Sequence, residues 1–351
     1  APHKVKLAVS GCPRNCAESG IKDVGVIGVD SGWEIYVAGN GGIKTEVAHF
    51  FTKVKTAEEV LEVSGAFLQL YREEGWYLER TTHYVARVGL EHVKKKVLED
   101  EANRQVLRAR LQAALDRYDP DPQRYYLTTN MPETRDSDWS WAGFIERNNN
   151  ELVANWGNLV NRVLNMTQRY FGGVVQEPGE LTAADAALLA AVAEGFDSVG
   201  ELYDACKFRA AVQEVLRLST LVNQYLEEAS PWTVFKTDPT AAGRALYVAL
   251  QAIGSLRILW APVLPFTSQS LHEMLGEPGT IFGEQTIRQY DEMTRSHLGL
   301  TYDGANAVGR WEPTTIPAGR ALPKPQPLFK KLEPELVEAE LARLGPKPDI
   351  Q

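Results

Sequence analysis

The first third of the chain alternates short apolar runs with turn-forming residues. Each of these runs is bounded by Gly, Asp or Asn, and this pattern predicts strands at residues 4–9, 24–29 and 33–38. Thr56 can cap a helix over residues 57–71, and a charged helical stretch follows over residues 83–115 with a break at Gly89. This part of the chain is therefore predicted to be α+β.

The hydrophobic period becomes helical from about residue 138. Ser137 or Asp138 can cap a short helix that runs through Arg147. Further helices are predicted at residues 151–171 before Gly172-Gly173, at 183–196 after Thr182, from 202 or 206 to 228, at 241–260 after Pro239, and at 268–275. Helices joined by short connections indicate an antiparallel bundle.

The pattern weakens past residue 277, where residues 304–328 are rich in proline and glycine and predict an extended arm. A last helix is predicted over residues 333–344. The predicted fold class is mixed: an N-terminal α+β fragment precedes an all-α antiparallel helical bundle with an extended C-terminal arm. The predicted domains are a fragment at 1–112, a junction and connecting segment at 113–137, the bundle at 138–276, and the arm with its terminal helix at 277–351.

Composition narrows the possible partners of the 351-residue chain. Residues 1–119 hold 17 basic and 17 acidic side chains, and residues 120–351 hold 20 and 29, so the formal charge of −9 belongs to the second part. Such a charge argues against a DNA partner. Uninterrupted apolar runs long enough to span a membrane do not occur. Three cysteines exclude a disulfide scaffold and favour a reducing cytoplasm.

Two cysteines, Cys12 and Cys16, lie four residues apart on a Gly/Pro loop that follows the first predicted strand, in the sequence SGCPRNC. Both can face one metal centre or cluster. The alternatives are two reduced structural thiols, or a disulfide in an oxidising compartment. Zinc sites prefer a C-x2-C spacing and need two further ligands. The spacing alone leaves these alternatives open.

The sequence segments around this loop resemble those of a known protein family. GCPRNCAESGIKDVGVIG, GWEIYVAGNGGIKTEVA and SGAFLQLYREEGWYLERTTHYVARVG closely resemble the C-terminal sirohaem region of the large subunit of NAD(P)H-dependent nitrite reductase. In that family four cysteines, in a C-x5-C and a C-x3-C pair, hold a [4Fe–4S] cluster. Cys12 and Cys16 match the second pair, and Cys16 matches the cysteine that bridges the cluster to the sirohaem iron.

The family's first cysteine pair, its basic nitrite-clasping residues and its flavin and nucleotide domains lie upstream, and this sequence does not contain them. We therefore expect this chain alone to retain neither sirohaem nor a [4Fe–4S] cluster, because two thiolates replace four. Another chain would have to supply the missing cysteine pair. The first third is expected to be a folded remnant without activity.

The second part has no coherent catalytic set by residue type, because its histidines are scattered and H-E-x-x-H or nucleophile-elbow motifs do not occur. Its sequence motifs nevertheless closely resemble those of methionyl-tRNA synthetase over about residues 115–344. The matching segments are DRYDPDPQRYYLTTNMPETRDSDWSW, RNNNELVANWGNLVNRVLNMTQRYFGG, VNQYLEEASPWTVFK and ALYVALQAIGSLRILWAPVLPFTSQSLHEMLG. The resemblance implies a connecting segment and a helical anticodon-binding domain.

The resemblance also implies an anticodon site. Trp232 matches the tryptophan that stacks on an anticodon base, and Pro231 would fix its backbone. Asn158 and Arg162, four apart on one helix face, match residues that hydrogen-bond the first anticodon base. Splayed bases of single-stranded loops are read by stacking and by hydrogen bonds to their edges. By residue type alone, a core tryptophan and a solvated helix face are the simpler interpretations.

The family's HIGH-type and KMSKS-type motifs do not occur in this sequence, so no catalytic residue can be assigned. The two resemblances meet near residues 111–119 without a Gly/Ser or Pro linker. We predict a chain that binds the anticodon loop of methionine tRNA but cannot aminoacylate. The alternatives are part of a sirohaem/[4Fe–4S] nitrite reductase completed by another chain, or a non-functional fusion of two gene fragments.

Overall fold

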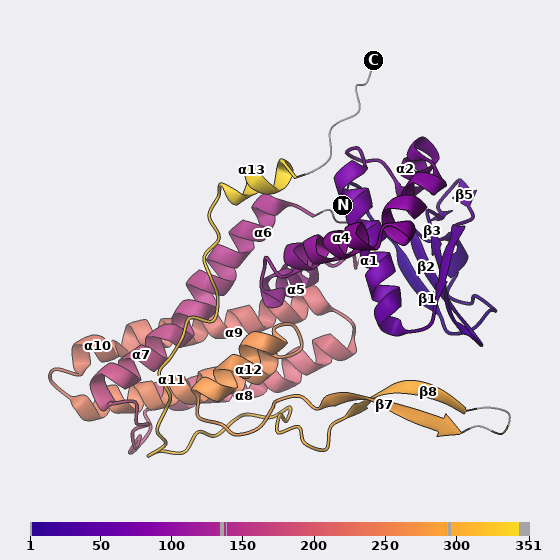
Figure 1. Cartoon of the computed structure of the whole chain (residues 1–351). Coiled ribbons are helices and arrows are strands. Elements are labelled where there is room, and N and C mark those ends of the chain that lie inside the picture. Colours follow the sequence, from indigo (N-terminus) through magenta and orange to yellow (C-terminus); the bar gives the residue numbers. More distant parts are fainter. Residues whose placement is uncertain (1, 134–136, 138, 292, 294–295, 344–351) are drawn as a thin grey trace. The chain divides into compact units, whose positions relative to one another are not determined.

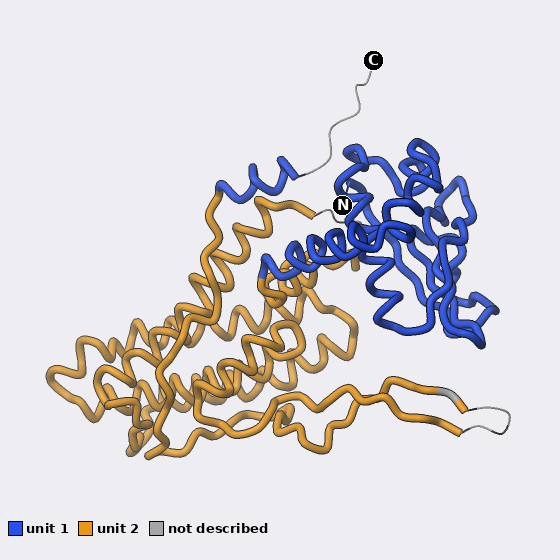
Figure 2. Tube along the Cα trace, viewed as in Figure 1, with its two compact units in different colours: residues 1–118, 335–351 blue, residues 119–334 orange. Residues whose placement is uncertain are grey.

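The computed structural model describes residues 2–133, 137, 139–291, 293 and 296–343, and it divides into two compact units (Figure 2). The first unit consists of residues 1–118 and 335–351, and the second of residues 119–334. A small sheet and its helices belong to the first unit, and helices dominate the second (Figure 1). The mixed fold class predicted from the sequence is confirmed at this level.

A four-stranded sheet with the order β1-β2-β3-β6 forms the centre of the first unit. Its strands are β1 (Leu7–Ser10), β2 (Val24–Val29), β3 (Gly32–Val37) and β6 (His49–Val54). β1 pairs with β2 in parallel, and the other neighbours are antiparallel. The three predicted strands are confirmed with shifted ends. β6 and the two-residue strands β4 (Asn40–Gly41) and β5 (Thr45–Glu46) were not predicted.

Five helical segments of this unit follow the strands: α1 (Ala57–Glu74), α2 (Thr81–Val88), α3 (Leu90–Lys94), the π-helical η2 (Lys95–Glu99) and α4 (Glu101–Leu115). The short η1 (Ser19–Ile21) precedes β2, and α13 (Leu336–Leu341) comes near the end of the chain. The core lies between the sheet and α1, where Ile35, Val37, Phe67 and Tyr71 are all fully buried. The predicted break at Gly89 is confirmed, since this residue has φ 88° between α2 and α3.

Thr56 begins α1 as predicted, through a reciprocal capping box. Its hydroxyl accepts the backbone N–H of Glu59 at 3.2 Å, and the Glu59 carboxylate accepts the N–H of Thr56 at 3.1 Å. Replacing Thr56 with alanine is expected to destabilise α1 by about 1 kcal/mol, because a backbone donor loses its acceptor. Amide hydrogen exchange in the full chain should show about fivefold weaker protection along α1. Thr56→Ser keeps the hydroxyl and serves as the control; equal protection in both variants would contradict the cap.

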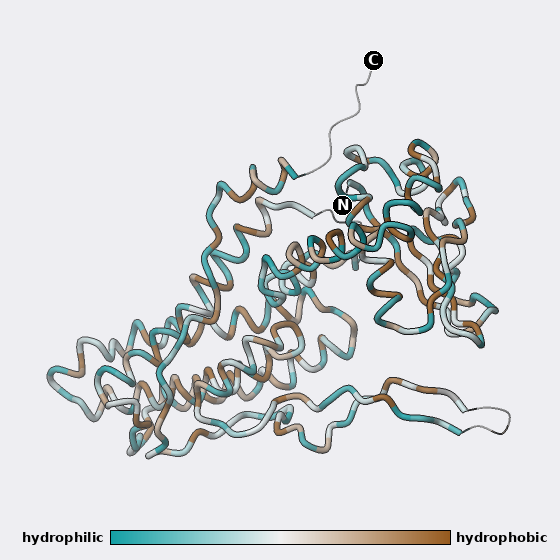
Figure 3. Tube along the Cα trace, viewed as in Figure 1, coloured by the Kyte–Doolittle hydropathy of each residue, from teal (hydrophilic) through white to brown (hydrophobic). Residues whose placement is uncertain are grey.

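The second unit is mostly helical and includes three long helices. The helices are α5 (Pro120–Thr129), α6 (Trp141–Arg147), the π-helical η3 (Asn148–Gly157), α7 (Asn158–Phe171), α8 (Ala183–Asp204), α9 (Phe208–Ala229), α10 (Pro231–Val234), α11 (Pro239–Trp260) and α12 (Pro265–Met274). α11 is the central helix, because nearly every residue from Ala242 to Trp260 is buried and α7, α8, α9 and α12 all contact it. Figure 3 shows hydrophobic positions recurring along these helices.

Several predicted helix ends are confirmed and one cap is wrong. Gly172 adopts the left-handed conformation directly after α7, Thr182 caps α8 through its hydroxyl, and Pro239 opens α11. Ser140, rather than Ser137, caps α6, because its side chain accepts the N–H of Gly143 at 3.2 Å. The alternative cap, Asp138, lies outside the described residues. α8 also runs on past its predicted end at residue 196.

A β-hairpin follows the helices, and it was not predicted. β7 (Glu284–Asp291) pairs with β8 (Ser296–Asp303) and projects from the helices of its own unit (Figure 1). The chain then returns along the helices. The side chain of Gln251 on α11 accepts a hydrogen bond from the N–H of Ile316 at 2.7 Å and donates one to its carbonyl at 2.8 Å. Near α6, Asn149 accepts the N–H of Leu332 at 2.9 Å and donates to its carbonyl at 2.7 Å. None of the helices in the described ranges is long and apolar enough to cross a bilayer.

Candidate nucleic-acid interface

The turn from α9 to α10 positions Pro231 and Trp232. Ser230 ends α9 in the left-handed conformation with φ 41°, and its hydroxyl donates to the carbonyl of Glu227 at 2.5 Å. Pro231 is the first residue of α10 and is buried, which suits a residue whose ring fixes φ and which has no N–H to satisfy. The chain reverses sharply here, so Trp232 lies at the end of the helices rather than along them.

Trp232 is half-buried, with part of its side chain packed against the helical core. Arg162 on α7 covers the ring, with the guanidinium carbon 5.0 Å from the ring centroid. A cation over an indole face is attracted by the negative face of the ring. The structure therefore brings Trp232 and Arg162 together although 70 positions of sequence separate them.

Asn158 is exposed at the start of α7, one turn before Arg162 and on the same helix face. It borders a shallow cavity that Val153, Gly157, Asn161 and the returning segment at Pro327–Phe329 also line. The amide of Asn158 offers one donor and one acceptor to solvent at this place. Arg169, a further cation on α7, is exposed, and its guanidinium lies over the ring of Tyr170.

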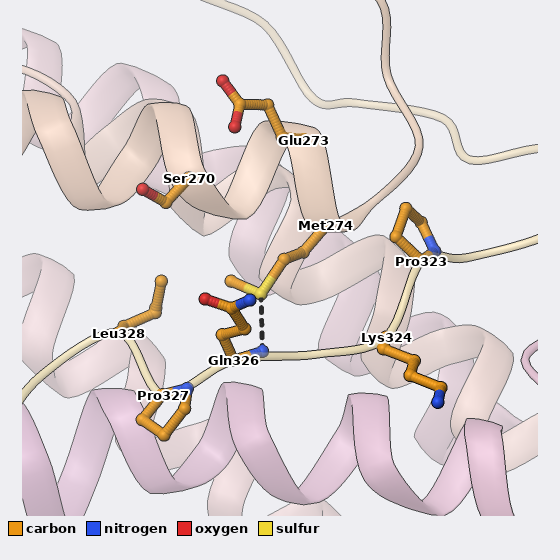
Figure 4. Close-up of a pocket in the computed structure, with 8 residues that line it drawn as sticks. All are labelled: Ser270, Glu273, Met274, Pro323, Lys324, Gln326, Pro327 and Leu328. Carbon is orange, nitrogen blue, oxygen red and sulfur yellow. Dashed lines mark hydrogen bonds between the residues drawn. The ribbon is translucent and has the colours of Figure 1, made fainter.

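The segment that borders Asn158 is held from its other side by α12. In Figure 4 this segment runs beside α12, and a second shallow cavity is lined by Pro323, Lys324, Gln326, Pro327 and Leu328 together with Ser270, Glu273 and Met274 of α12. The backbone N–H of Gln326 donates to the sulfur of Met274 at 3.2 Å, as the dashed line shows. This contact fixes the returning chain, and with it the wall of the cavity beside Asn158.

Glu227 was not identified as a site residue from the sequence. Its carboxylate accepts a hydrogen bond from Arg162 at 2.8 Å, although it is 61% exposed. This ion pair holds the guanidinium at the ring of Trp232. The pairing joins residues 65 positions apart on α7 and α9, so sequence spacing gave no signal for it.

A buried carboxylate beneath this turn ties three helices together. Asp185 on α8 accepts the hydroxyl of Tyr225 on α9 at 2.6 Å and pairs with Arg244 on α11 at 3.2 Å. Burial alone would raise the pKa of Asp185, but hydrogen bonds from Tyr225 and Thr182 and the charge of Arg244 hold it below its ordinary value. The helix ends that carry Trp232 are therefore fixed to one another.

The other predicted site, Cys12 and Cys16, lies on a loop between β1 and η1. Asn15, with φ 53°, organises the loop: its N–H donates to the carbonyl of Cys12 at 3.1 Å, and its side-chain oxygen accepts the N–H of Gly20 at 3.3 Å. Cys12 is half-buried and Cys16 is exposed, and both thiols are unpaired. A side chain at Gly25 would collide with the carbonyl of Ser19, so β2 and the loop approach closely.

Two thiolates do not fit a [4Fe–4S] cluster, which takes four. Within the part of the chain that the structure describes, groups of three or more His, Cys, Asp or Glu that could hold a metal do not occur. The third cysteine, Cys206, belongs to the second unit. Assignment of Cys12 and Cys16 as cofactor ligands stays a prediction.

Comparison with protein families finds different matches for the two parts of the chain. Residues 1–106 match the nitrite and sulphite reductase 4Fe–4S domain. Residues 101–164 match the class I tRNA synthetases for methionine, and residues 175–303 match the anticodon-binding domain of methionyl-tRNA ligase. The chain thus joins a reductase-like segment to a methionyl-tRNA synthetase-like segment that includes an anticodon-binding domain, as the sequence motifs indicated.

The particular relatives are methionine–tRNA ligases. The enzyme of Chloroflexus aggregans is 50% identical over 231 residues, which are 66% of this chain and 38% of the relative. That of Thermomicrobium roseum is 49% identical over 232 residues, covering 66% and 40%. The apo structure of Mycobacterium tuberculosis methionyl-tRNA synthetase superposes with a TM-score of 0.52 at 25% identity, covering 63% of this chain and 41% of that one. The chain spans about two-fifths of the length of these relatives.

Proposed function

We propose that the second unit binds the anticodon loop of methionine tRNA through Trp232, Asn158 and Arg162. The observation that carries the proposal is the contact between Arg162 and Trp232, on the same surface as the exposed Asn158. These three side chains combine a stacking ring with donors and an acceptor for a base edge. The match to the anticodon-binding domain of methionyl-tRNA ligase and the identity to methionine–tRNA ligases support the choice of tRNA.

Binding in this proposal requires Arg162 to move. The guanidinium covers Trp232 in the free chain, so an incoming base takes its place on the ring. Arg162 then leaves Glu227 and donates to the edge of the base, while Asn158 supplies an acceptor as well as a donor. The base is thereby stacked and hydrogen-bonded by groups that already lie together.

The proposal includes the arrangement that supports the site. We infer that α8, α9 and α11 form the antiparallel bundle predicted from the sequence, with Pro231 and Trp232 at one end. The nearly complete burial of α11 and its contacts with α8 and α9 support this inference. Asp185, which joins all three helices beneath the turn, supports it as well.

Base discrimination tests the proposal directly. The full chain should bind methionine tRNA, with anticodon CAU, more tightly than the same tRNA with its first anticodon base changed. We expect a difference of roughly 5- to 150-fold, the scale of a lost pair of base-edge hydrogen bonds. Fluorescence anisotropy at low ionic strength is the suitable measurement, because the unit is acidic and phosphate contacts weaken with salt. Equal affinity for the two tRNAs would exclude anticodon reading.

A further inference from the structure

Two donor atoms of a buried arginine in the second unit, Arg257 on α11, have no acceptor among the described residues. The residue is 3% exposed, and its Nε and Nη1 atoms are buried without a hydrogen-bond partner among the described residues. His272 on α12 is also 3% exposed. Its Nε2 lies 3.0 Å from the carbonyl of Pro278, whereas its buried Nδ1 has no partner in the described part of the chain. Buried polar groups are nearly always paired, so these atoms need an explanation.

The charges around Arg257 compensate it only in part. Glu277, in the turn after α12, is the acidic group that acts on it, but the carboxylate of Glu277 is already paired with Arg320 of the returning chain. Two guanidinium groups therefore share one carboxylate. Glu273 lies on the exposed side of α12 and accepts a hydrogen bond from Gln269 at 3.0 Å. An unpaired buried cation is strongly unfavourable unless a counter-charge joins it.

The protonation states favour an anion as that counter-charge. Burial, together with Arg320, lowers the pKa of Arg257 to about 10, which leaves it charged at neutral pH. Burial and the charge of Arg257 also lower the pKa of His272, despite opposing effects from Pro278, Glu277 and Glu273. An anion would reverse both effects, because it stabilises the charged form of each group.

We propose that Arg257 and His272 bind a small inorganic anion of about the size of chloride between α11, α12 and the returning chain. Both residues are almost entirely buried, which favours a small ion over a larger one. Arg257 donates through Nε and Nη1. The Nε2–H of His272 donates to Pro278, and a proton added at Nδ1 donates to the anion. Binding therefore takes up a proton, and it tightens as the pH falls toward the lowered pKa of His272 in the anion-free protein.

Bromide is a suitable probe, because it replaces chloride and scatters anomalously. Crystals of the full chain grown in sodium bromide should show an anomalous peak within hydrogen-bonding distance of Arg257 Nε and Nη1. In solution, sodium bromide should raise the thermal midpoint relative to sodium gluconate at equal ionic strength, and titration should show roughly tenfold tighter binding at pH 5.5 than at pH 7.5. A water molecule at the site without a bromide peak, or equal midpoints in the two salts, would overturn the proposal.

Variants separate the site from general salt effects. His272→Gln should bind bromide without the dependence on pH, and Arg257→Met should lose the bromide effect altogether. Arg217→Met, which removes a 55% exposed arginine side chain from α9, should keep it. If Arg257→Met does not fold, the bromide titrations of the unmodified chain and of His272→Gln still decide the outcome. A bromide effect in His272→Gln that changes with pH as in the unmodified chain would contradict the role of His272.

Discussion

Replacing Trp232 with alanine is expected to weaken binding of methionine tRNA by roughly 5- to 150-fold, which corresponds to about 1–3 kcal/mol for the loss of one base–aromatic stack. The ring provides the flat surface of the proposed site, and Arg162 remains over it only while the ring is present. Alanine therefore removes the stacking partner of the base. Anisotropy titration of the full chain with methionine tRNA measures the change.

Two further variants define what the tryptophan does. Trp232→Phe keeps a smaller ring and should fall between the unmodified chain and Trp232→Ala. Thr233→Ala changes an exposed neighbour on α10 and should bind as the unmodified chain does. Because Trp232 also packs against the core, the thermal midpoint of each variant should be recorded alongside. Unchanged affinity in a folded Trp232→Ala protein would show that tRNA does not stack at this residue.

Replacing Asp23 with alanine is expected to destabilise the first unit by about 3–5 kcal/mol, because removal of one partner of a buried ion pair leaves the other charge uncompensated. The side chain of Asp23 is fully buried and accepts hydrogen bonds from the backbone N–H of Lys6 at 2.8 Å, from Arg80 at 3.0 Å and from the hydroxyl of Thr81. It therefore connects the residue before β1 with the start of α2. Arg80, 16% exposed, would lose its carboxylate.

Amide exchange in the full chain localises this effect. Protection along β2 and β3 should fall by roughly two to four powers of ten in Asp23→Ala. Asp30→Ala, which changes an exposed residue in the turn between the same strands, should leave protection nearly unchanged. The second unit provides an internal reference within the same sample. Similar protection in both variants would show that Asp23 does not stabilise the sheet.

Local signals in the sequence predicted much of the fold because each acts over a few residues. The hydroxyls of Thr56 and Thr182, the ring of Pro239 and the glycines after residue 171 mark helix ends by chemistry that tertiary contacts do not alter. The predicted cap at Ser137 was wrong, because several candidate residues lie close together in the sequence and only the course of the chain decides that Ser140 caps α6. The β7–β8 hairpin was not predicted because β7 is almost entirely exposed, and a strand without a buried face need not alternate apolar and polar residues.

Part of the candidate site could also be predicted from the sequence, and part could not. The surrounding sequence motifs identified Trp232, Asn158 and Arg162, and the structure brings Arg162 to Trp232. The partner of Arg162, Glu227, depends on the packing of α7 against α9, which no local pattern contains. Arg257 and His272 likewise lie on helices whose sequence does not indicate that three of their nitrogen atoms have no partner in the described part of the chain. Which side chains pair between different helices is decided only when those helices pack together.

The burial of α11 has a consequence for how the second unit is made. During synthesis α7, α8 and α9 leave the ribosome before α11, and the faces that later enclose it are then without their partner. The long helices can therefore complete their packing only after residue 260 has emerged, because the last buried positions of α11 reach to Trp260. Until then the growing chain presents apolar faces that chaperones bind. A chain that stopped within α11 would keep those faces exposed.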